Sequence, residues 1–419
     1  MNKLHTVNGY KVLTIPVNDT NIIYVQSYIL SGRMNEGVKT SGISHLLEHI
    51  LTESWKKCKD DCAKYWGKKG IITNASTGDS TINYYVEGLD KNYKELIEYI
   101  IKITTAPVFN ESRINVEKKA VKEELKREMN DPGWKIAYKI SCLFFSHLGL
   151  QNGNNVPLQI DNLKNLDMDI LKKYCKEIYT PKNILFIVSG DFRTSSILNV
   201  FKKFLPKNSP VGKINIKTNF LKKISRPLTH FLKNPNSKSA EIVISFFSKI
   251  YLYDIEALYF TLIIDILSGG MHSLLMRKLR TELHLIYNIK IYMEPEITGT
   301  LTTIETTGEQ ENVLEIIKTI KSVLQDFIKG NWDDEHMIRI RDRYLIKDEK
   351  VCKNNIFMGD YYGEQYLTQL YKKKRTIRSI KQKNNIIKRA TKKDIIIAAK
   401  KAFPLNKMIT VYQCKNKQH

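Results

Sequence analysis

The most informative stretch of this sequence is His45-Leu46-Leu47-Glu48-His49, because it indicates both the fold and the chemistry of the chain. Residues 41–53 around it have the apolar spacing of a helix. On a helix, positions i and i+4 lie on one face, so His45 and His49 can offer two imidazole nitrogens to a single zinc ion. Glu48 lies beside that face and can act as the general base on zinc-bound water.

The arrangement is the H-x-x-E-H motif of inverted zinc peptidases. A match of three specified residues within five positions is moderately specific, and the competing interpretation is a pair of surface histidines on an amphipathic helix. A catalytic zinc site has three protein ligands and leaves its fourth position for water. The motif helix supplies two, so the third ligand must come from elsewhere in the chain.

That third ligand is predicted in a second helical segment, residues 111–130. Glu117 and Glu124 are separated by two turns, so both face the same way with small apolar residues between them. We predict Glu124 as the third zinc ligand and Glu117 as a residue that orients a ligand from behind. The alternative for both is a solvated helix glutamate, and Glu123 is assigned to that class.

The rest of the chain divides into two blocks of similar size. Residues 1–208 show alternating strand and helix patterns and contain the motif. Residues 209–228 contain prolines, a glycine and many lysines, which is typical of a linker. Residues 229–419 form a second α+β block, and a length of 419 residues fits two to three domains of ~150 residues. The pattern predicts an α+β fold and suggests two homologous domains.

Several segments resemble the M16 zinc metallopeptidases, the pitrilysin-type family that includes insulinase and the mitochondrial processing peptidase. The resemblance covers nearly the whole chain, and the 75-residue step from His49 to Glu124 is close to the family's spacing. The segments that carry it are 31–33 with Glu36, 42–49, 74–77 with 81–85, 179–183 with 188–191, and 268–270 with Arg280 and Tyr287.

The resemblance implies two α/β-sandwich domains, each an antiparallel-rich sheet packed with helices, that form one half-shell of a peptidase clamp. It implies that Asn74 and Ala75 lie on an edge strand that binds substrate. Arg280 would bind a substrate carbonyl or backbone, and Tyr287 would donate a hydrogen bond to the oxyanion at the scissile bond. The alternatives are strand packing for Tyr287 and an ion pair with Glu282 for Arg280.

The implied function is that of a zinc-dependent metalloendopeptidase, with one zinc ion per chain, acting on peptides or unfolded segments. The alternative is a non-catalytic structural or partner subunit of the same fold, although such subunits usually lose the motif residues that this chain keeps. Longer family members contain four such domains, so the resemblance implies a homodimer or a heterodimer with a related chain. Residues 50–55 depart from the family's common continuation, which argues against a presequence-cleaving role.

Composition bears on two further classes of function. The chain has 67 Lys and Arg residues and 43 Asp and Glu residues, which gives a net charge of +24. A charge this positive is typical of proteins that bind nucleic acids. The lysines are spread along the whole chain and no recognised nucleic-acid motif is present, so we do not expect nucleic acid as a partner. No stretch approaches the ~20 apolar residues of a membrane span.

The six cysteines are thinly scattered and do not predict a disulfide framework. The close pair Cys58 and Cys62 lacks the second half of a metal-binding motif. We therefore expect a cytoplasmic or other reducing compartment, which includes host cytoplasm or a virion if the source is viral. We expect no signal or transit peptide.

Overall fold

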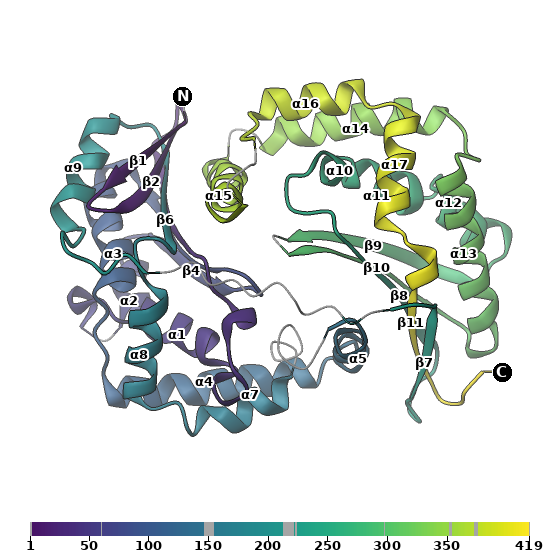
Figure 1. The fold of residues 1–419 in the computed structure, drawn as a ribbon, viewed down its shortest axis with the longest axis horizontal. Coiled ribbons are helices and arrows are strands. Elements are labelled where there is room, and N and C mark those ends of the chain that lie inside the picture. Colours follow the sequence, from purple (N-terminus) through teal and green to yellow (C-terminus); the bar gives the residue numbers. More distant parts are fainter. Residues whose placement is uncertain are drawn as a thin grey trace. The chain divides into compact units, whose positions relative to one another are not determined.

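The computed structural model describes residues 2–59, 61–145, 155–212, 222, 224–296, 298–351, 354–372 and 376–418. The chain forms two compact units (Figure 1). Unit 1 comprises residues 1–132, 145–220 and 351–377, and unit 2 comprises residues 133–144, 221–350 and 378–419. Each unit contains one sheet packed with helices, which confirms the predicted α+β class.

Unit 1 is built on a six-stranded sheet with the order β1-β2-β6-β3-β5-β4. Strands β2 and β6 are parallel, and all other neighbours are antiparallel. Strand β4 pairs with β5 and, within the described part of the chain, lies at an edge of the sheet. The strands are β1 (Lys3–Val7), β2 (Tyr10–Pro16), β3 (Ile22–Ile29), β4 (Ile72–Thr77), β5 (Ile82–Leu89) and β6 (Ile184–Gly190).

Helices cover both faces of this sheet, with α3 and α9 on one side and α15 on the other (Figure 1). Strand β3 is buried from its second residue to its last, as expected of a strand covered on both faces. The helices are α1 (Ile43–Thr52), α2 (Cys62–Gly67), α3 (Tyr93–Thr105), α4 (Glu111–Met129), α7 (Val156–Leu163), α8 (Met168–Ile178), α9 (Thr194–Phe204) and α15 (Asn355–Lys372).

Helix α15 packs closely on the sheet because it presents glycine to the strands. A Cβ atom on Gly359 would lie 2.7 Å from the Tyr24 ring. Gln26 and Tyr28 both donate hydrogen bonds to Oδ1 of Asp360, at 2.8 and 3.1 Å. These contacts place α15 in unit 1, whereas the sequence analysis included its residues in the second domain. The boundary at 208–228 also differs at α5 (Trp134–Phe144), which belongs to unit 2.

Unit 2 contains a five-stranded sheet with the order β7-β11-β8-β10-β9. This order repeats β2-β6-β3-β5-β4 of unit 1, including the single parallel pair, which is β7 with β11. The two units therefore share one topology, as the suggested duplication requires. The strands are β7 (Leu228–Lys233), β8 (Ala240–Ser248), β9 (Ile286–Glu296), β10 (Gly299–Gly308) and β11 (Ile409–Cys414).

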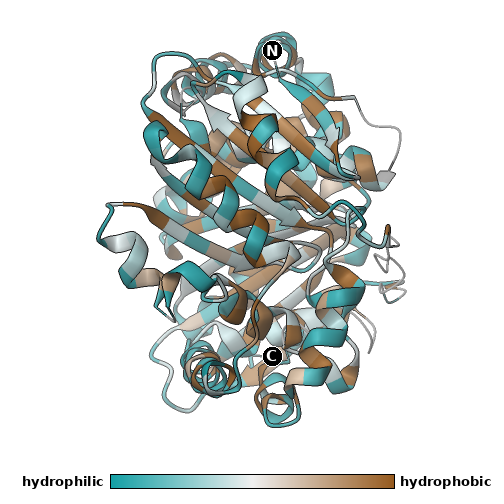
Figure 2. Ribbon diagram, turned by 90° about the vertical axis from the view of Figure 1, so that its left-hand side faces the viewer, coloured by the Kyte–Doolittle hydropathy of each residue, from teal (hydrophilic) through white to brown (hydrophobic). Residues whose placement is uncertain are grey.

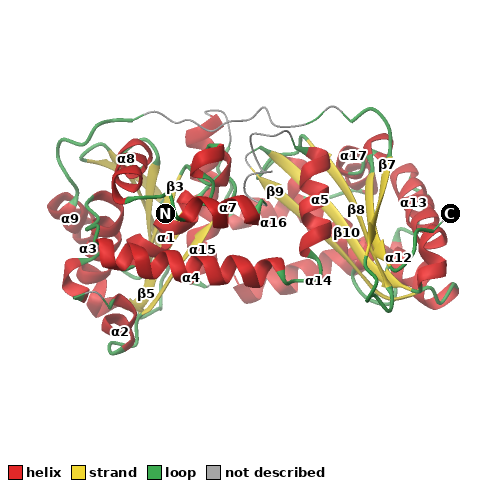
Figure 3. Ribbon diagram, turned by 90° about the horizontal axis from the view of Figure 1, so that it is seen from below, coloured by secondary structure: helices red, strands yellow, loops and turns green. Residues whose placement is uncertain are grey.

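The helices of unit 2 lie beside this sheet (Figure 3). Aliphatic and aromatic side chains from the helices and the sheet form the core of the unit. Hydrophobic and hydrophilic residues alternate along the helices (Figure 2), and helices such as α3 and α9 bury their apolar side. No helix among the described residues has the length and apolarity of a membrane span. Besides α5, the helices are α10 (Ile255–Leu258), α11 (Phe260–Ser268), α12 (Leu274–Met276), α13 (Val313–Lys329), α14 (Glu335–Val351), α16 (Ile380–Arg389) and α17 (Lys392–Ala402).

Candidate metal centre

Helix α1 carries the H-x-x-E-H residues, and its start is fixed by Glu36 and Gly42. Gly42 has a φ of 93°, in the left-handed region that favours glycine. The buried carboxylate of Glu36 accepts hydrogen bonds from the backbone N–H groups of Gly42 and Ser44, at 2.8 and 2.9 Å. Glu36 thereby satisfies donors of the first turn that have no partner within the helix.

The three predicted ligands lie together. The His45 and His49 rings are 5.0 Å apart between centroids on one face of α1, and helix α4 brings Glu124 against them. Oε2 of Glu124 lies 3.6 Å from Nε2 of His45 and 3.4 Å from Nε2 of His49. Donor atoms that surround one zinc ion tetrahedrally at ~2.1 Å are about 3.4 Å apart, so the donor set fits zinc with three protein ligands.

Glu117 lies behind His49, as predicted. Oε2 of Glu117 is 3.2 Å from Nδ1 of His49, and Oε1 is 2.9 Å from Nε of Arg113. The hydrogen bond with His49 lowers the pKa of Glu117, and the Arg113 charge adds to this. Because an ionised carboxylate only accepts hydrogen bonds, Nδ1 of His49 carries the proton that Glu117 accepts, and Nε2 is the nitrogen that faces Glu124.

Burial, together with the neighbouring His49, lowers the pKa of His45 to about 4. The imidazole of His45 is therefore neutral at pH 7, which is the form that binds metals. Glu123, which points away from this cluster, is exposed and pairs with Lys126 at 2.7 Å. Its assignment to a solvated helix face agrees with this position.

Glu48 is held by a residue that the sequence analysis did not assign. Oγ1 of Thr77, the last residue of β4, donates a hydrogen bond of 2.6 Å to Oε2 of Glu48. Burial raises the pKa of Glu48, while the Thr77 hydrogen bond opposes that rise. A carboxylate with a raised pKa is better matched to proton transfer near neutral pH. Thr77 follows Asn74-Ala75 in sequence, but no spacing rule connects it with Glu48.

A cavity of about 460 Å³ connects the cluster with the edge strand. Asn74 and Ala75 on β4 line it together with Glu48, His49 and Glu124. Among the described residues, no strand pairs with the outer edge of β4, so its backbone can pair with an added strand. The geometry thus joins the predicted substrate strand to the predicted ligands.

Arg280 and Tyr287 lie in unit 2 and contact each other. The Arg280 guanidinium is 4.5 Å from the centre of the Tyr287 ring, a cation–π contact. Tyr287 is 76% exposed, so packing within the strand does not explain it. Glu282 pairs with Arg277 and Lys278, not with the predicted alternative partner Arg280. The described contacts thus show neither strand packing of Tyr287 nor an ion pair of Arg280 with Glu282.

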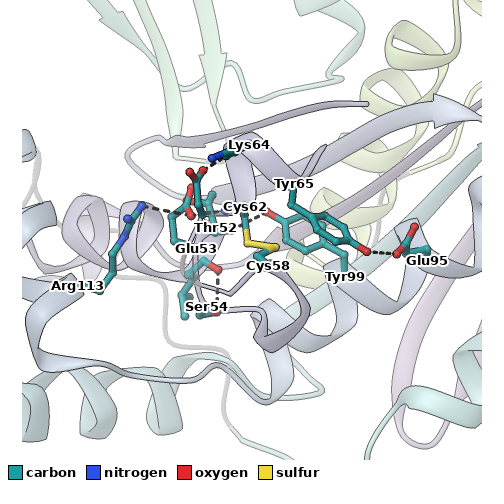
Figure 4. The surroundings of a disulfide bond; sticks show 12 residues. Thr52, Glu53, Ser54, Cys58, Cys62, Lys64, Tyr65, Glu95, Tyr99 and Arg113 are labelled. Carbon is teal, nitrogen blue, oxygen red and sulfur yellow. Dashed lines mark hydrogen bonds and ion pairs between the residues drawn. A yellow bond between two sulfur atoms is a disulfide. The ribbon is translucent and has the colours of Figure 1, made fainter. Parts of the chain in front are cut away.

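The structure also corrects the analysis of Cys58 and Cys62, which form a disulfide bond (Figure 4). Both cysteines are buried, at the end of a short 3-10 helix and at the start of α2. A pair separated by four positions was not predicted to form a disulfide, because spacing alone does not reveal whether two Cβ atoms face each other. Cys142, Cys175 and Cys414 are free thiols.

Comparison with known families identifies two matching models. Residues 11–134 match the model for insulinase (peptidase family M16), and residues 165–344 match the model for the peptidase M16 inactive domain. The metal cluster lies in the first matched region, while Arg280 and Tyr287 lie in the second.

Several curated relatives are named zinc proteases. The chain is 26% identical to zinc protease PqqE of Helicobacter pylori over 51% of its own length and 49% of that protein. It thus spans about half of that relative. It is 23% identical to the uncharacterized zinc protease YmxG of Bacillus subtilis, over 76% of each chain, and 22% identical to a zinc protease of Rickettsia felis.

Solved structures share the fold over the whole chain. A protease from Helicobacter pylori superposes with a TM-score of 0.84 at 17% identity, over 99% of both chains. A peptidase M16 inactive domain from Pseudomonas fluorescens superposes with a TM-score of 0.83 at 14% identity, over 100% of this chain and 99% of the other. At these identities the likeness concerns the fold.

Proposed function

Because the chain belongs to the peptidase M16 family, we propose that it is a zinc-dependent endopeptidase that hydrolyses peptides or unfolded segments. The observation that carries the proposal is the convergence of His45, His49 and Glu124, with donor atoms within 4.8 Å of one another. Glu48 lies between the two histidines on the same helix and is assigned the role of general base. When bound, zinc supplies a Lewis acid that polarises the scissile carbonyl and makes water more acidic.

In this proposal Glu48 moves the proton. Its Oε2 accepts the Thr77 hydrogen bond, which leaves Oε1 to take a proton from the attacking water and to pass it to the leaving amine. The Thr77 hydroxyl fixes the carboxylate plane and so limits the positions that Oε1 can occupy. Glu117 holds the His49 ring in the orientation that presents Nε2.

Substrate binding is assigned to the free edge of β4. An extended peptide would add as a strand beside Asn74 and Ala75, so that backbone hydrogen bonds provide affinity with little dependence on sequence. Strand addition requires an extended substrate, which is why peptides and unfolded segments are the proposed class.

We also propose that the chain works as a pair, either a homodimer or a heterodimer with a related chain. Arg280 and Tyr287 of one chain would then serve the metal centre of the other. Their mutual stacking, together with the exposure of Tyr287, supports a role towards a substrate. Arg280 would bind its backbone and Tyr287 would donate to the oxyanion.

The test is digestion of a peptide library with and without a zinc chelator. We expect cleavage that the chelator abolishes and added zinc restores. Glu48→Gln should keep about one zinc per chain but lose ~10²–10⁴-fold in kcat, since it cannot accept the proton. His49→Ala should lose most of the zinc. Chelator-insensitive cleavage would refute the proposal, and a zinc-loaded chain without cleavage would favour the partner-subunit alternative.

A further inference from the structure

The Cys58–Cys62 disulfide lies beside the candidate metal centre. Cys62 is the first residue of α2, and it lines the same cavity as Glu48, His49 and Glu124. The mechanism proposed above uses neither cysteine. The bridge therefore borders the reaction cavity but has no part in the proposed chemistry, so its redox state can serve another purpose.

A continuous series of polar contacts connects this bridge with His49. The backbone N–H of Cys62 donates to Oε2 of Glu53 at 2.7 Å. The same oxygen lies 3.2 Å from Nη2 of Arg113 (Figure 4). Arg113 in turn pairs through Nε with Glu117 at 2.9 Å, and Glu117 contacts Nδ1 of His49 at 3.2 Å.

Reduction of the bridge would disturb the first contact of this series. Non-bonded heavy atoms rest about 3.5–4 Å apart, so two thiols need more room than two bonded sulfurs. Both cysteines are buried, and the backbone N–H of Cys58 donates a hydrogen bond of 3.0 Å to the Trp55 carbonyl. The residues that move are therefore those of the first turn of α2, where the Cys62 N–H donates its hydrogen bond to Glu53.

The rest of α2 is anchored independently of the bridge. Trp66, one turn further on, is 1% exposed and stacks on Trp55 with ring centroids 5.3 Å apart. Tyr99 packs against both tryptophans. The expected change is thus a local shift at Cys62 and Glu53 and not the unfolding of the helix.

We propose that Cys58–Cys62 is a redox-active disulfide that sets the metal affinity of the neighbouring centre, tight when oxidised and weak when reduced. The inference rests on the zinc centre of the proposed function. The reductant is a dithiol. One of its thiolates attacks Sγ of Cys62, the bridge residue that lines the cavity, and Sγ of Cys58 leaves as a thiolate. The second thiolate of the reductant resolves the mixed disulfide, so two electrons and two protons pass to the cysteines while the dithiol becomes a disulfide.

The consequence follows the series of contacts to the ligand. Once Glu53 shifts, Arg113 loses one of its two carboxylate partners and holds Glu117 less firmly. Loss of such support behind a ligand typically weakens metal binding 10- to 100-fold. Because Glu117 and Arg113 remain in contact, we expect the lower end, about a tenfold increase in the zinc Kd.

The experiment measures zinc affinity of the full chain by chelator competition in both redox states. The reduced sample is treated with a dithiol and desalted without oxygen, since dithiols bind zinc themselves. Mass spectrometry after alkylation counts the thiols, and reduction should add two labelled cysteines. We expect the reduced chain to bind zinc about tenfold more weakly, with unchanged circular dichroism.

Variants separate this effect from unrelated ones. A Cys58→Ser, Cys62→Ser chain should bind zinc like the reduced protein in both conditions, whereas Cys142→Ser, which changes a free thiol in unit 2, should respond like the wild type. Glu53→Gln should reduce the difference in zinc affinity between the oxidised and the reduced chain. Equal zinc affinity in both states, or an oxidised chain whose Cys58 and Cys62 can be alkylated, would overturn the inference alone. Absence of zinc binding in either state would overturn the proposed function as well.

Discussion

Nδ1 of His49 lies 3.2 Å from Oε2 of Glu117, and this contact determines which nitrogen of His49 is left for a metal. The Glu117 side chain is buried, and Arg113 compensates its charge. A buried, charge-paired carboxylate is a rigid support, so the His49 ring has little freedom to turn away from Glu124.

Replacement of Glu117 tests this support. Glu117→Gln keeps the shape of the side chain but removes the charge that polarises His49 and pairs with Arg113. We expect zinc affinity to fall 10- to 100-fold in a chelator competition. The matched control is Glu123→Gln on the same helix, which removes an exposed carboxylate paired with Lys126 and should leave affinity unchanged. Similar losses in both variants would rule out a specific role for Glu117.

Thr77 should matter for turnover and not for binding. Thr77→Val keeps the shape but removes the hydroxyl that donates to Glu48 at 2.6 Å. Hydrogen bonds to charged groups contribute about 1.5–3 kcal/mol, so we expect kcat to fall roughly 10- to 100-fold at constant KM and zinc content. Thr77→Ser restores the donor and should recover most of the activity. A valine variant with wild-type kcat would show that Glu48 is positioned without Thr77.

Glu36 should make stability depend on pH. Burial raises the pKa of Glu36 to about 7, against the opposing effect of the Gly42 and Ser44 N–H groups. Between about pH 4.5 and 7 the folded state therefore holds a proton that the unfolded state has released, so this contribution to stability is present at low pH and is lost as pH rises. The loss amounts to at most about 3 kcal/mol.

The measurement compares metal-free wild type with Glu36→Gln in urea unfolding at about pH 5 and about pH 7.5, on either side of the titration. Because glutamine does not titrate, the stability difference between wild type and variant should move against the wild type as pH rises. A difference that stays constant, or that moves in favour of the wild type, would contradict a raised pKa for Glu36.

Helical spacing was sufficient to predict the core of the site. His45 with His49 and Glu117 with Glu124 each follow from the period of one helix, and the packing of α1 on α4 then brings the two pairs together. The same rule would also have found Arg113, one turn before Glu117. The class of fold followed from the alternation of strand and helix patterns.

Contacts between distant segments were beyond such rules. Thr77 reaches Glu48 only because β4 lies beside α1, and Asp360 joins Gln26 only because α15 returns to the first sheet. The Cys58–Cys62 bridge depends on the direction of two Cβ atoms at the ends of two short helices, which composition does not encode. Each of these three contacts depends on how separate segments are placed in the folded chain, so the periodicity of a single helix or strand cannot predict it.

The last prediction concerns assembly. If two chains share their sites, Glu48 of one chain works with Tyr287 of the other. Glu48→Gln lacks the base, and Tyr287→Phe lacks the hydroxyl that donates to the oxyanion, so each variant alone should be nearly inactive. In a mixed pair, one site carries both changes and the other carries neither.

Mixing the two inactive variants therefore restores activity only in the shared arrangement. With equal amounts and free exchange, half of the pairs are mixed and half of their sites are intact, so activity should return to about a quarter of the wild-type value. The Tyr287→Phe change keeps an aromatic ring for Arg280 to stack on, so the inactivity of this variant reports the lost hydroxyl. The control mixes each variant with the double variant Glu48→Gln, Tyr287→Phe, which offers no intact site in either arrangement. If the mixture of single variants stays as inactive as this control while sedimentation shows exchange between chains, Tyr287 does not serve the metal centre of a second chain.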